Sequence, residues 1–279
     1  MNCAHLKSRK ILRVSGEEAE SFLQGLITCN LDQISDEGLL FGALLTPQGK
    51  VLFDFFVHAG DDGMLIDIDG EAGADFMKRL MFYRLRAPVE IEAVDDLDVY
   101  AAWDGAQEET TKGHLDPRLA ELGARSLSAP GAIETNADEA TWNNHRIALG
   151  MPASGADFAF GDVFPHDVMM DCFSKTSGVD FTKGCYVGQE VVSRMQHRGT
   201  ARRRFVKVAA EEPLSSGTDL LAGSRSVGTI GSVAGATGLA LVRIDRVASA
   251  LADDTEILAD NVPVTLTLPA WSGIEWPST

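Results

Sequence analysis

A cysteine that stands between glycines and close to basic residues has the most reactive chemistry in this sequence. Cys185 lies in the segment Lys-Gly-Cys-Tyr-Val-Gly-Gln-Glu at residues 183–190. Residues 187–196 have the pattern of a helix, which would place the thiol just ahead of a helix N-terminus, two residues from Lys183. A helix dipole and a neighbouring ammonium both favour a thiolate. Cys185 is therefore a candidate nucleophile, redox thiol or transient metal ligand. A small buried hydrophobic side chain is an equally good interpretation, since most unpaired cysteines are buried.

The same segment opens a cluster of positive charge in an acidic chain. The formal net charge of the 279 residues is -17. Residues 183–204 contain six basic residues and one acidic residue, Glu190, which gives a local net charge of +5. We call these six basic residues the basic cluster: Lys183, Arg194, Arg198, Arg202, Arg203 and Arg204. Such a cluster needs either a polycarboxylate or phosphate ligand, or buried carboxylates of the protein itself. The overall negative charge disfavours nucleic acid and anionic membranes as partners.

The cysteines also bear on metal binding and on location. The four are spread along the chain without a C-x-x-C pair or zinc-ligand spacing: Cys3, Cys29, Cys172 and Cys185. This spacing is typical of reduced thiols inside a cell, and it predicts no stably bound metal. No apolar run reaches the length of a membrane span, and no apolar leader opens the sequence. We therefore expect a cytoplasmic protein, and a monomer.

The hydrophobic pattern predicts an α+β fold. Strands are expected at residues 9–14, 39–45, 51–57, 64–68 and 89–92. Three helices are expected. The first follows Ser15, which forms a capping box with Glu18; the second spans residues 71–85; the third runs from an N-cap at Asn136 to Leu149. Residues 104–114 are polar and predict a loop. From Phe205 onward, short β-type runs separated by Gly, Ser and Asp indicate an all-β barrel or sandwich.

Several segments carry a resemblance to a known family. Residues 183–190, together with Arg194 and Arg198, resemble the signature K-G-C-[YI]-x-G-Q-E-x-x-x-R of the YgfZ family. These are folate-binding proteins of iron–sulfur cluster assembly and repair, related in fold to the aminomethyltransferase (T-protein) of the glycine cleavage system. Further family-like segments lie at residues 22–28, 46–51, 116–125, 150–152, 238–243 and 268–271.

The resemblance implies a fold, a ligand and a function. The fold would be T-protein-like: a discontinuous folate-binding domain (1–49 and 126–203), an inserted α+β domain (50–125) and a C-terminal β-barrel (204–279). Tetrahydrofolate or a one-carbon derivative would contact the following residues, with Cys185 facing it: Lys183, Tyr186, Gln189, Glu190, Arg194 and Asp167. The protein would assist assembly or repair of iron–sulfur clusters, with client or assembly proteins as partners.

Two other functions stay open at this point. The related T-protein fold suggests a folate-dependent one-carbon transferase, but the catalytic acids of the T-protein cannot be matched to positions here. The arginines of residues 198–204 suggest a module that binds RNA or a protein.

Overall fold

The structure is a computed structural model that describes residues 1–34, 38–105, 113–173, 177–199 and 201–278. The chain divides into two compact units. Unit 1 comprises Met1–Trp142 and Phe173–Val191, and unit 2 comprises Asn143–Cys172 and Val192–Thr279. The three-domain division implied by the resemblance stays a prediction.

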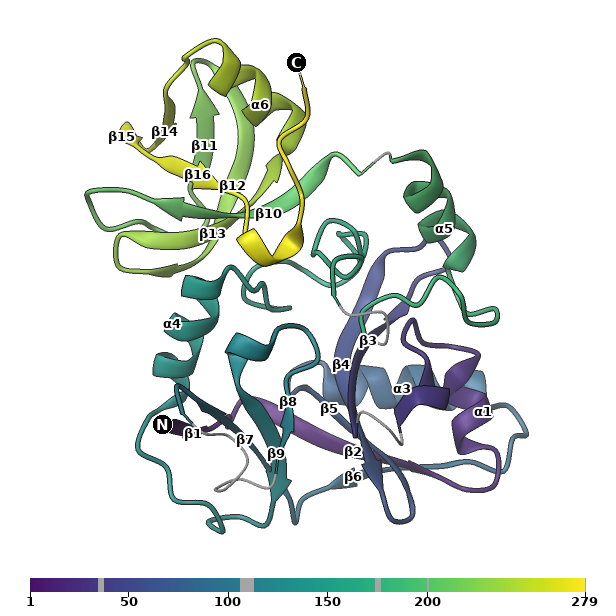
Figure 1. The fold of residues 1–279 in the computed structure, drawn as a ribbon. Coiled ribbons are helices and arrows are strands. Elements are labelled where there is room, and N and C mark those ends of the chain that lie inside the picture. Colours follow the sequence, from purple (N-terminus) through teal and green to yellow (C-terminus); the bar gives the residue numbers. More distant parts are fainter. Residues whose placement is uncertain (35–37, 106–112, 174–176, 200, 279) are drawn as a thin grey trace. The chain divides into compact units, whose positions relative to one another are not determined.

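The centre of unit 1 is a five-stranded antiparallel sheet with strand order β3-β4-β5-β2-β6 (Figure 1). The strands are β2 (Arg9–Ser15), β3 (Leu39–Leu45), β4 (Val51–Gly60), β5 (Gly63–Asp69) and β6 (Glu90–Val94). Every residue of β3 is buried, as its unbroken apolar sequence predicts. The β3–β4 hairpin closes where Pro and Gly predicted a turn, and Gly49 adopts φ +80° there. All five strands were predicted to within three residues.

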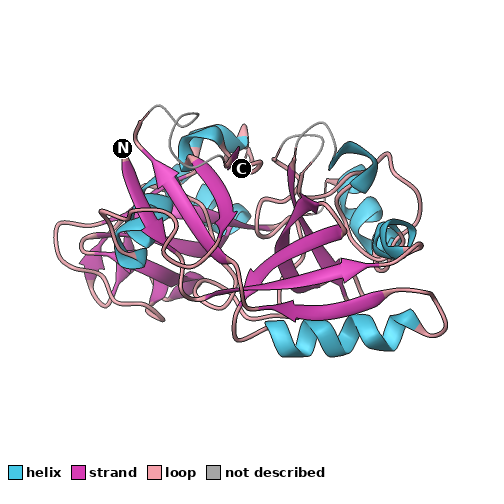
Figure 2. Cartoon of the chain, turned by 90° about the horizontal axis from the view of Figure 1, so that it is seen from below, coloured by secondary structure: helices cyan, strands magenta, loops and turns pink. Residues whose placement is uncertain are grey.

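Two helices pack on this sheet, α1 (Ala19–Gln24) and α3 (Gly73–Arg84). In Figure 2 the longest helix, α3, runs alongside strands. Its Phe76 ring lies 4.9 Å from that of Phe55, in the core. The capping box predicted at Ser15 is wrong, because Ser15 is still part of β2 and the helix begins at Ala19 without a side-chain cap. Gly16 makes the intervening turn at φ +109°, where an added Cβ would lie 2.3 Å from the Pro88 carbonyl oxygen.

A second sheet of unit 1 was not predicted as a unit. It has the order β1-β7-β9-β8, with antiparallel neighbours: β1 (Asn2–His5), β7 (Asp98–Trp103), β8 (His114–Leu115) and β9 (Ala124–Ser128). The predicted loop at residues 104–114 ends in the short strand β8, and its residues 106–112 lie outside the described part. The 3₁₀ turns η1 (Leu31–Gln33) and η2 (Ala120–Leu122) complete unit 1.

Unit 2 holds a seven-stranded antiparallel sheet of barrel-like curvature, ordered β15-β14-β11-β12-β13-β10-β16. Its strands are β10 (Arg203–Ala209), β11 (Asp219–Ala222), β12 (Arg225–Ala234), β13 (Thr237–Arg243), β14 (Ile257–Ala259), β15 (Val262–Pro263) and β16 (Thr265–Thr267). Helix α6 (Ile244–Ala252) packs on β12 and β13, and η3 (Ala270–Ser272) follows the sheet. The core contains Val206, Leu220 and Val242, each at most 1% exposed. The α+β class with a C-terminal β-barrel is confirmed.

Two further helices in the described part of the chain are α4 (Glu139–Leu149) and α5 (Gln189–Arg198). Asn136 does not cap α4; its side chain accepts a hydrogen bond from the Cys3 backbone N–H. Asp138 takes the capping role, since its carboxylate accepts hydrogen bonds from the Thr141 N–H and hydroxyl. Within the described ranges, every helix is too short or too polar to cross a membrane.

Candidate functional site

The loop that carries the cysteine, residues 180–188, is built on an aspartate turn. Asp180 Oδ1 accepts hydrogen bonds from the backbone N–H groups of Thr182 (2.6 Å) and Lys183 (3.0 Å), and from the Thr182 hydroxyl (2.7 Å). The Asp180 N–H donates to the carbonyl of Thr28. Burial opposes ionisation of this carboxyl, but the hydrogen bonds from Thr182 and Lys183 bring its pKa below the usual value. We call residues 180–188 the Cys185 loop.

Lys183 anchors this loop to the segment that follows α1. Its Nζ donates to Gln24 Oε1 at 3.0 Å, to the Ile27 carbonyl at 2.9 Å and to the Cys29 carbonyl at 2.6 Å. An ammonium has three N–H donors, so these three acceptors use all of them. The residue is 9% exposed, and burial lowers its pKa. In this conformation Lys183 is a strut of the loop and has no donor left for a ligand.

Cys185 itself is exposed, whereas Cys3 and Cys29 are buried and Cys172 is half-buried. Burial raises the pKa of the Cys29 and Cys172 thiols to about 12 in each case, which makes both poor nucleophiles. The alternative of a buried structural Cys185 is therefore wrong. Accessibility singles this thiol out among the four.

The surroundings of Cys185 differ from the prediction in one respect. Helix α5 begins at Gln189, not at residue 187, so the thiol stands four residues before the helix. Gly188 adopts φ +81°, and an added Cβ there would lie 2.5 Å from the Thr46 carbonyl oxygen. The left-handed residue delays the helix. The Lys183 ammonium is bonded to Gln24 and to the carbonyls of Ile27 and Cys29.

Tyr186 follows the cysteine and points into the protein. It is 7% exposed, and the Lys183 ammonium lies 5.6 Å from its ring centroid. Its buried hydroxyl has no hydrogen-bond partner among the described residues. Burial raises the pKa of this phenol well above its usual value, a direction that keeps it a neutral donor. Buried polar groups normally have a hydrogen-bond partner, so the Tyr186 hydroxyl is an unsatisfied hydrogen-bonding group of this loop.

The other predicted folate contacts are three residues of α5, a helix that is divided between the two units, and Asp167. Gln189, Glu190 and Arg194 are on α5, where Gln189 is half-buried and the other two are exposed. Asp167 belongs to unit 2 and is 2% exposed. Its Oδ2 accepts hydrogen bonds from Arg203 Nη2 at 2.5 Å and from the Phe164 N–H at 2.9 Å. The role of these residues as folate contacts stays a prediction.

Part of the basic cluster is paired with carboxylates of unit 2. Arg203 bonds to Asp167, as above, and Arg204 makes two bonds to Asp171, at 2.6 and 2.8 Å. Arg204 is buried, and its guanidinium also donates to the His166 carbonyl. The second explanation for the cluster, carboxylates of the protein itself, thus holds for these two arginines. Their engagement weakens the RNA-binding alternative.

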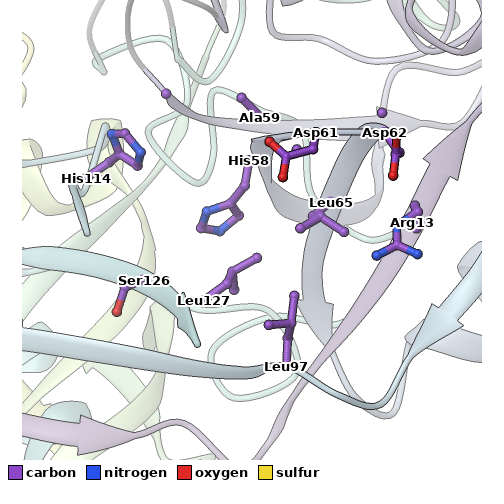
Figure 3. Close-up of a pocket in the computed structure, with 13 residues that line it drawn as sticks. Arg13, His58, Ala59, Asp61, Asp62, Leu65, Leu97, His114, Ser126 and Leu127 are labelled. Carbon is purple, nitrogen blue, oxygen red and sulfur yellow. The ribbon is translucent and has the colours of Figure 1, made fainter. Parts of the chain in front are cut away.

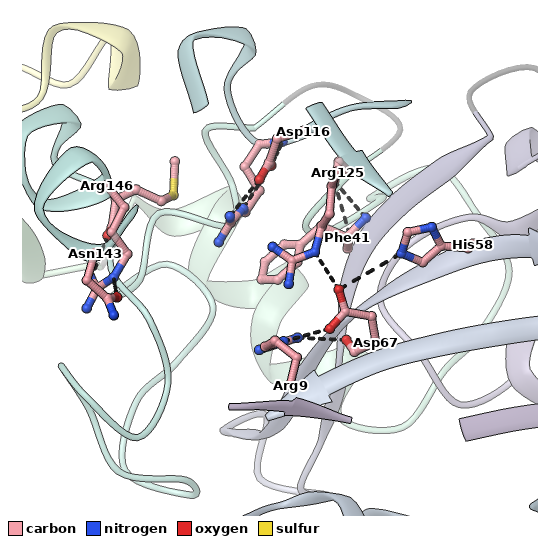
Figure 4. Close-up of polar contacts among 11 residues, drawn as sticks. Arg9, Phe41, His58, Asp67, Asp116, Arg125, Asn143 and Arg146 are labelled. Carbon is pink, nitrogen blue, oxygen red and sulfur yellow. Dashed lines mark hydrogen bonds and ion pairs between the residues drawn. The ribbon is translucent and has the colours of Figure 1, made fainter. Parts of the chain in front are cut away.

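A buried ion network in unit 1 was not predicted (Figure 4). Asp67 on β5 is 0% exposed; it accepts a hydrogen bond from Arg9 Nε at 2.6 Å and one from Arg125 Nε. The Arg125 guanidinium also stacks on Phe56, 4.1 Å from its ring centroid. Burial alone would raise the pKa of Asp67, but Arg125 and Arg9 bring it well below the usual range.

The ion network links the two sheets of unit 1, since Arg9 and Asp67 lie in one and Arg125 in the other. A signal for it was present in the sequence. An aspartate inside the apolar strand Met-Leu-Ile-Asp-Ile at residues 64–68 requires a buried cation as partner. Across the described ranges, no group of three His, Cys, Asp or Glu side chains is placed to hold a metal ion.

Comparison with known proteins identifies relatives along the whole chain. Human mitochondrial iron–sulfur cluster assembly factor IBA57 is 29% identical, with 99% of this chain and 85% of that protein covered. The mitochondrial IBA57 homologue of Neurospora crassa is 30% identical, with 72% of this chain and 52% of that protein covered. The chain is thus similar in sequence to the IBA57 iron–sulfur cluster assembly factors. It spans about half the length of the fungal relatives.

Two further matches concern the fold. Residues 202–274 match the family model of the CAF17 C-terminal β-barrel domain. The crystal structure of glycine cleavage system aminomethyltransferase T from Bartonella henselae superposes with a TM-score of 0.70, at 13% identity, over 99% of this chain and 86% of that one. The T-protein-like fold is thereby confirmed.

The predicted cytoplasmic location is wrong by the same comparison, because the IBA57 relatives are named as mitochondrial proteins. Scattered thiols indicate a reducing environment, and a reducing environment does not identify one compartment.

Proposed function

We propose that this protein assists the assembly of iron–sulfur clusters and that the Cys185 loop is its working surface. The names of its relatives support the process. The observation that carries the assignment to this loop is the exposed Cys185 thiol on a backbone fixed by Lys183 and Asp180. A thiol on a fixed backbone is presented to a partner protein in one position. Such a fixed, exposed position would assist the transfer of a cluster, whereas the packing of the protein core does not require it.

The chemistry of one thiol limits what the loop does. Protein-bound iron–sulfur clusters are held mostly by sets of cysteine thiolates, and the described residues offer no such set. Cys185 would therefore supply a single ligand to iron while a partner protein supplies the others. The role that follows is transient participation in cluster delivery, with the cluster as cargo.

Reduced folate is the second part of the proposal. The buried Tyr186 hydroxyl without a partner fits a ligand that presents a hydrogen-bond acceptor beside the loop, and the half-buried Gln189 adds amide groups. The engaged ammonium of Lys183 does not fit a direct ligand contact. A bound tetrahydrofolate would supply one-carbon chemistry; the chain's own residues would bind and orient it.

Complementation tests the role of Cys185. A strain that lacks the gene is supplied with wild type, Cys185→Ala or Cys172→Ala, and the activities of iron–sulfur enzymes are measured in extracts. We expect Cys185→Ala to be inactive at normal protein levels, because its thiol is the exposed one, and Cys172→Ala to restore activity. Full restoration by Cys185→Ala would remove this thiol from the mechanism.

Calorimetry tests the folate part. Wild type and Tyr186→Phe are titrated with tetrahydrofolate under reducing conditions. Since the substitution removes one hydroxyl and keeps the ring, it should weaken binding about tenfold if that hydroxyl contacts the ligand, without loss of folding stability. Absence of heat with wild type would reject folate binding and leave the cluster role standing.

A further inference from the structure

A cavity of about 370 Å³ lies in unit 1, and no residue of the Cys185 loop lines it (Figure 3). It is bordered by the β4–β5 hairpin and by residues of β2, β8 and β9. Three leucines give it an apolar wall: Leu65, Leu97 and Leu127. Its volume is near the lower end of the range found for small-molecule sites, about 300–1,000 Å³. Nothing in the proposed function uses it.

Two buried polar side chains of this cavity have unmet hydrogen-bonding atoms. His58 is 5% exposed and Ser126 is 4% exposed. Within the described part of the chain, His58 Nε2 and Ser126 Oγ have no hydrogen-bond partner. His58 Nε2 forms a long ion pair with Asp67 Oδ2, at 3.9 Å, which is beyond hydrogen-bond reach. A buried polar atom without a partner costs free energy, and a ligand in the cavity would recover it.

The charge at the mouth selects the class of ligand. Asp61 and Asp62 form the two-residue turn between β4 and β5, and both are exposed. In Figure 3 the two aspartates lie on one side of the cavity and Leu127 and Leu97 on the other, with His58 between them. Arg13, the cation at this mouth, is already paired with Glu92 at 2.9 Å. The mouth therefore has two carboxylates in excess, which repel anions and attract cations.

We propose that this cavity binds a small organic cation, an amine or amidine with a short apolar body. The carboxylates of Asp61 and Asp62 would take the cationic head, and the leucines would cover the apolar body. Ser126 and the imidazole of His58 would complete the hydrogen bonds. A metal ion is the less suitable cation, because no three His, Cys, Asp or Glu side chains in the described ranges are placed to hold one.

The probe for this site is butylamine, with butanol as its uncharged isostere and butyrate as its anionic counterpart. Each is titrated into the full chain while backbone amide signals are followed by NMR. We expect saturable shifts at Leu65 and Leu127 with butylamine, and affinity at least about tenfold lower for butanol and butyrate, because only the amine forms charge-assisted bonds with the carboxylates.

Matched variants locate the binding. Asp61→Asn with Asp62→Asn removes the two charges and keeps turn-compatible side chains; it should weaken butylamine binding about tenfold. The control is Asp253→Asn with Asp254→Asn, another exposed adjacent pair, in unit 2, and it should bind as wild type does.

Three results would overturn the proposal. They are absence of saturable shifts with butylamine, equal binding of butylamine and butanol, and unchanged affinity in the Asp61/Asp62 variant. Saturable binding of Zn²⁺ in place of the amine would identify a metal site and also reject the organic cation. Because the readout residues Leu65 and Leu127 are not part of the Cys185 loop, these results are independent of the complementation test.

Discussion

Replacement of Lys183 by methionine separates an anchoring role from a ligand-contact role. Methionine keeps most of the apolar stem and removes the ammonium. The carbonyls of Ile27 and Cys29, both in residues of 0% exposure, would then lose their charged donor. Gln24 is half-buried, and its Oε1 still accepts a hydrogen bond from the Leu31 N–H. Two buried acceptors left without partners cost about 1–3 kcal/mol each. We expect the free energy of unfolding to fall by about 3 kcal/mol.

The assay combines denaturant unfolding with thiol labelling. In wild type, a thiol reagent should modify the exposed Cys185 quickly and the buried Cys29 slowly. In Lys183→Met the loop loses its anchor beside Cys29, so labelling of Cys29 should accelerate. Lys78→Met, an exposed lysine on α3, is the control, and its unfolding free energy should stay within about 0.5 kcal/mol of wild type.

One result would refute the anchoring argument. If Lys183→Met unfolds within about 0.5 kcal/mol of wild type and Cys29 stays protected, the three hydrogen bonds do not hold the loop. A simultaneous loss of tetrahydrofolate binding would then restore Lys183 to the ligand-contact role expected from the sequence.

Three further predictions concern unit 1. Asp67→Asn leaves the guanidiniums of the half-buried Arg9 and the buried Arg125 without their carboxylate, and should lower the free energy of unfolding by about 3–5 kcal/mol in denaturant titrations. Burial lowers the pKa of His58, so below about pH 6.5 the unfolded chain binds a proton that the folded chain does not. Stability should therefore fall on acidification by up to about 1.4 kcal/mol per pH unit from this group, and His58→Gln should remove that part of the slope. Leu85 is 85% exposed with φ +49°, and Leu85→Gly should raise stability by about 1 kcal/mol because glycine adopts positive φ without strain.

Each of these has an outcome that contradicts it. A loss below about 1 kcal/mol for Asp67→Asn would mean that solvent reaches the guanidiniums. An unchanged pH slope in His58→Gln would show that folded His58 takes up its proton as readily as the unfolded residue does. A lower melting temperature for Leu85→Gly would mean that the leucine makes stabilising contacts that outweigh its backbone strain.

Local sequence patterns correctly predicted the strands and helices that have an unbroken run or a regular stripe of buried apolar residues. The apolar run at residues 39–45 is β3 without any shift, and α3 begins and ends within two residues of the predicted helix. The sheet formed by β1, β7, β8 and β9 was missed because its strands pair over separations of up to about 100 residues; Asn2, for example, lies opposite Trp103. The hydrophobic periodicity of a segment indicates which of its own residues are buried, but it does not indicate which distant strand pairs with it.

The start of α5 shows the same limit at the candidate site. The pattern of residues 187–196 is helical, yet the helix begins at Gln189 because Gly188 is held at positive φ against the Thr46 carbonyl. Thr46 belongs to a hairpin about 140 residues earlier in the chain. The distance of Cys185 from the helix N-terminus is therefore set by tertiary contact, and the thiolate argument that depended on it could not be tested from the sequence.

The basic cluster leads to a related conclusion about what gives the Cys185 loop its specificity. The net charge of the basic cluster predicted an anionic ligand or carboxylates of the protein itself as its partners. Uncharged carbonyl acceptors do not contribute to a net charge and so could not be predicted in this way. The structure gives Arg203 and Arg204 carboxylate partners and gives Lys183 two backbone carbonyls and an amide oxygen. Since a cation already bonded on all its donors attracts a further ligand weakly, recognition at the loop cannot depend mainly on Lys183. We propose that it depends instead on the exposed Cys185 thiol and on the buried Tyr186 hydroxyl, which has no hydrogen-bond partner among the described residues.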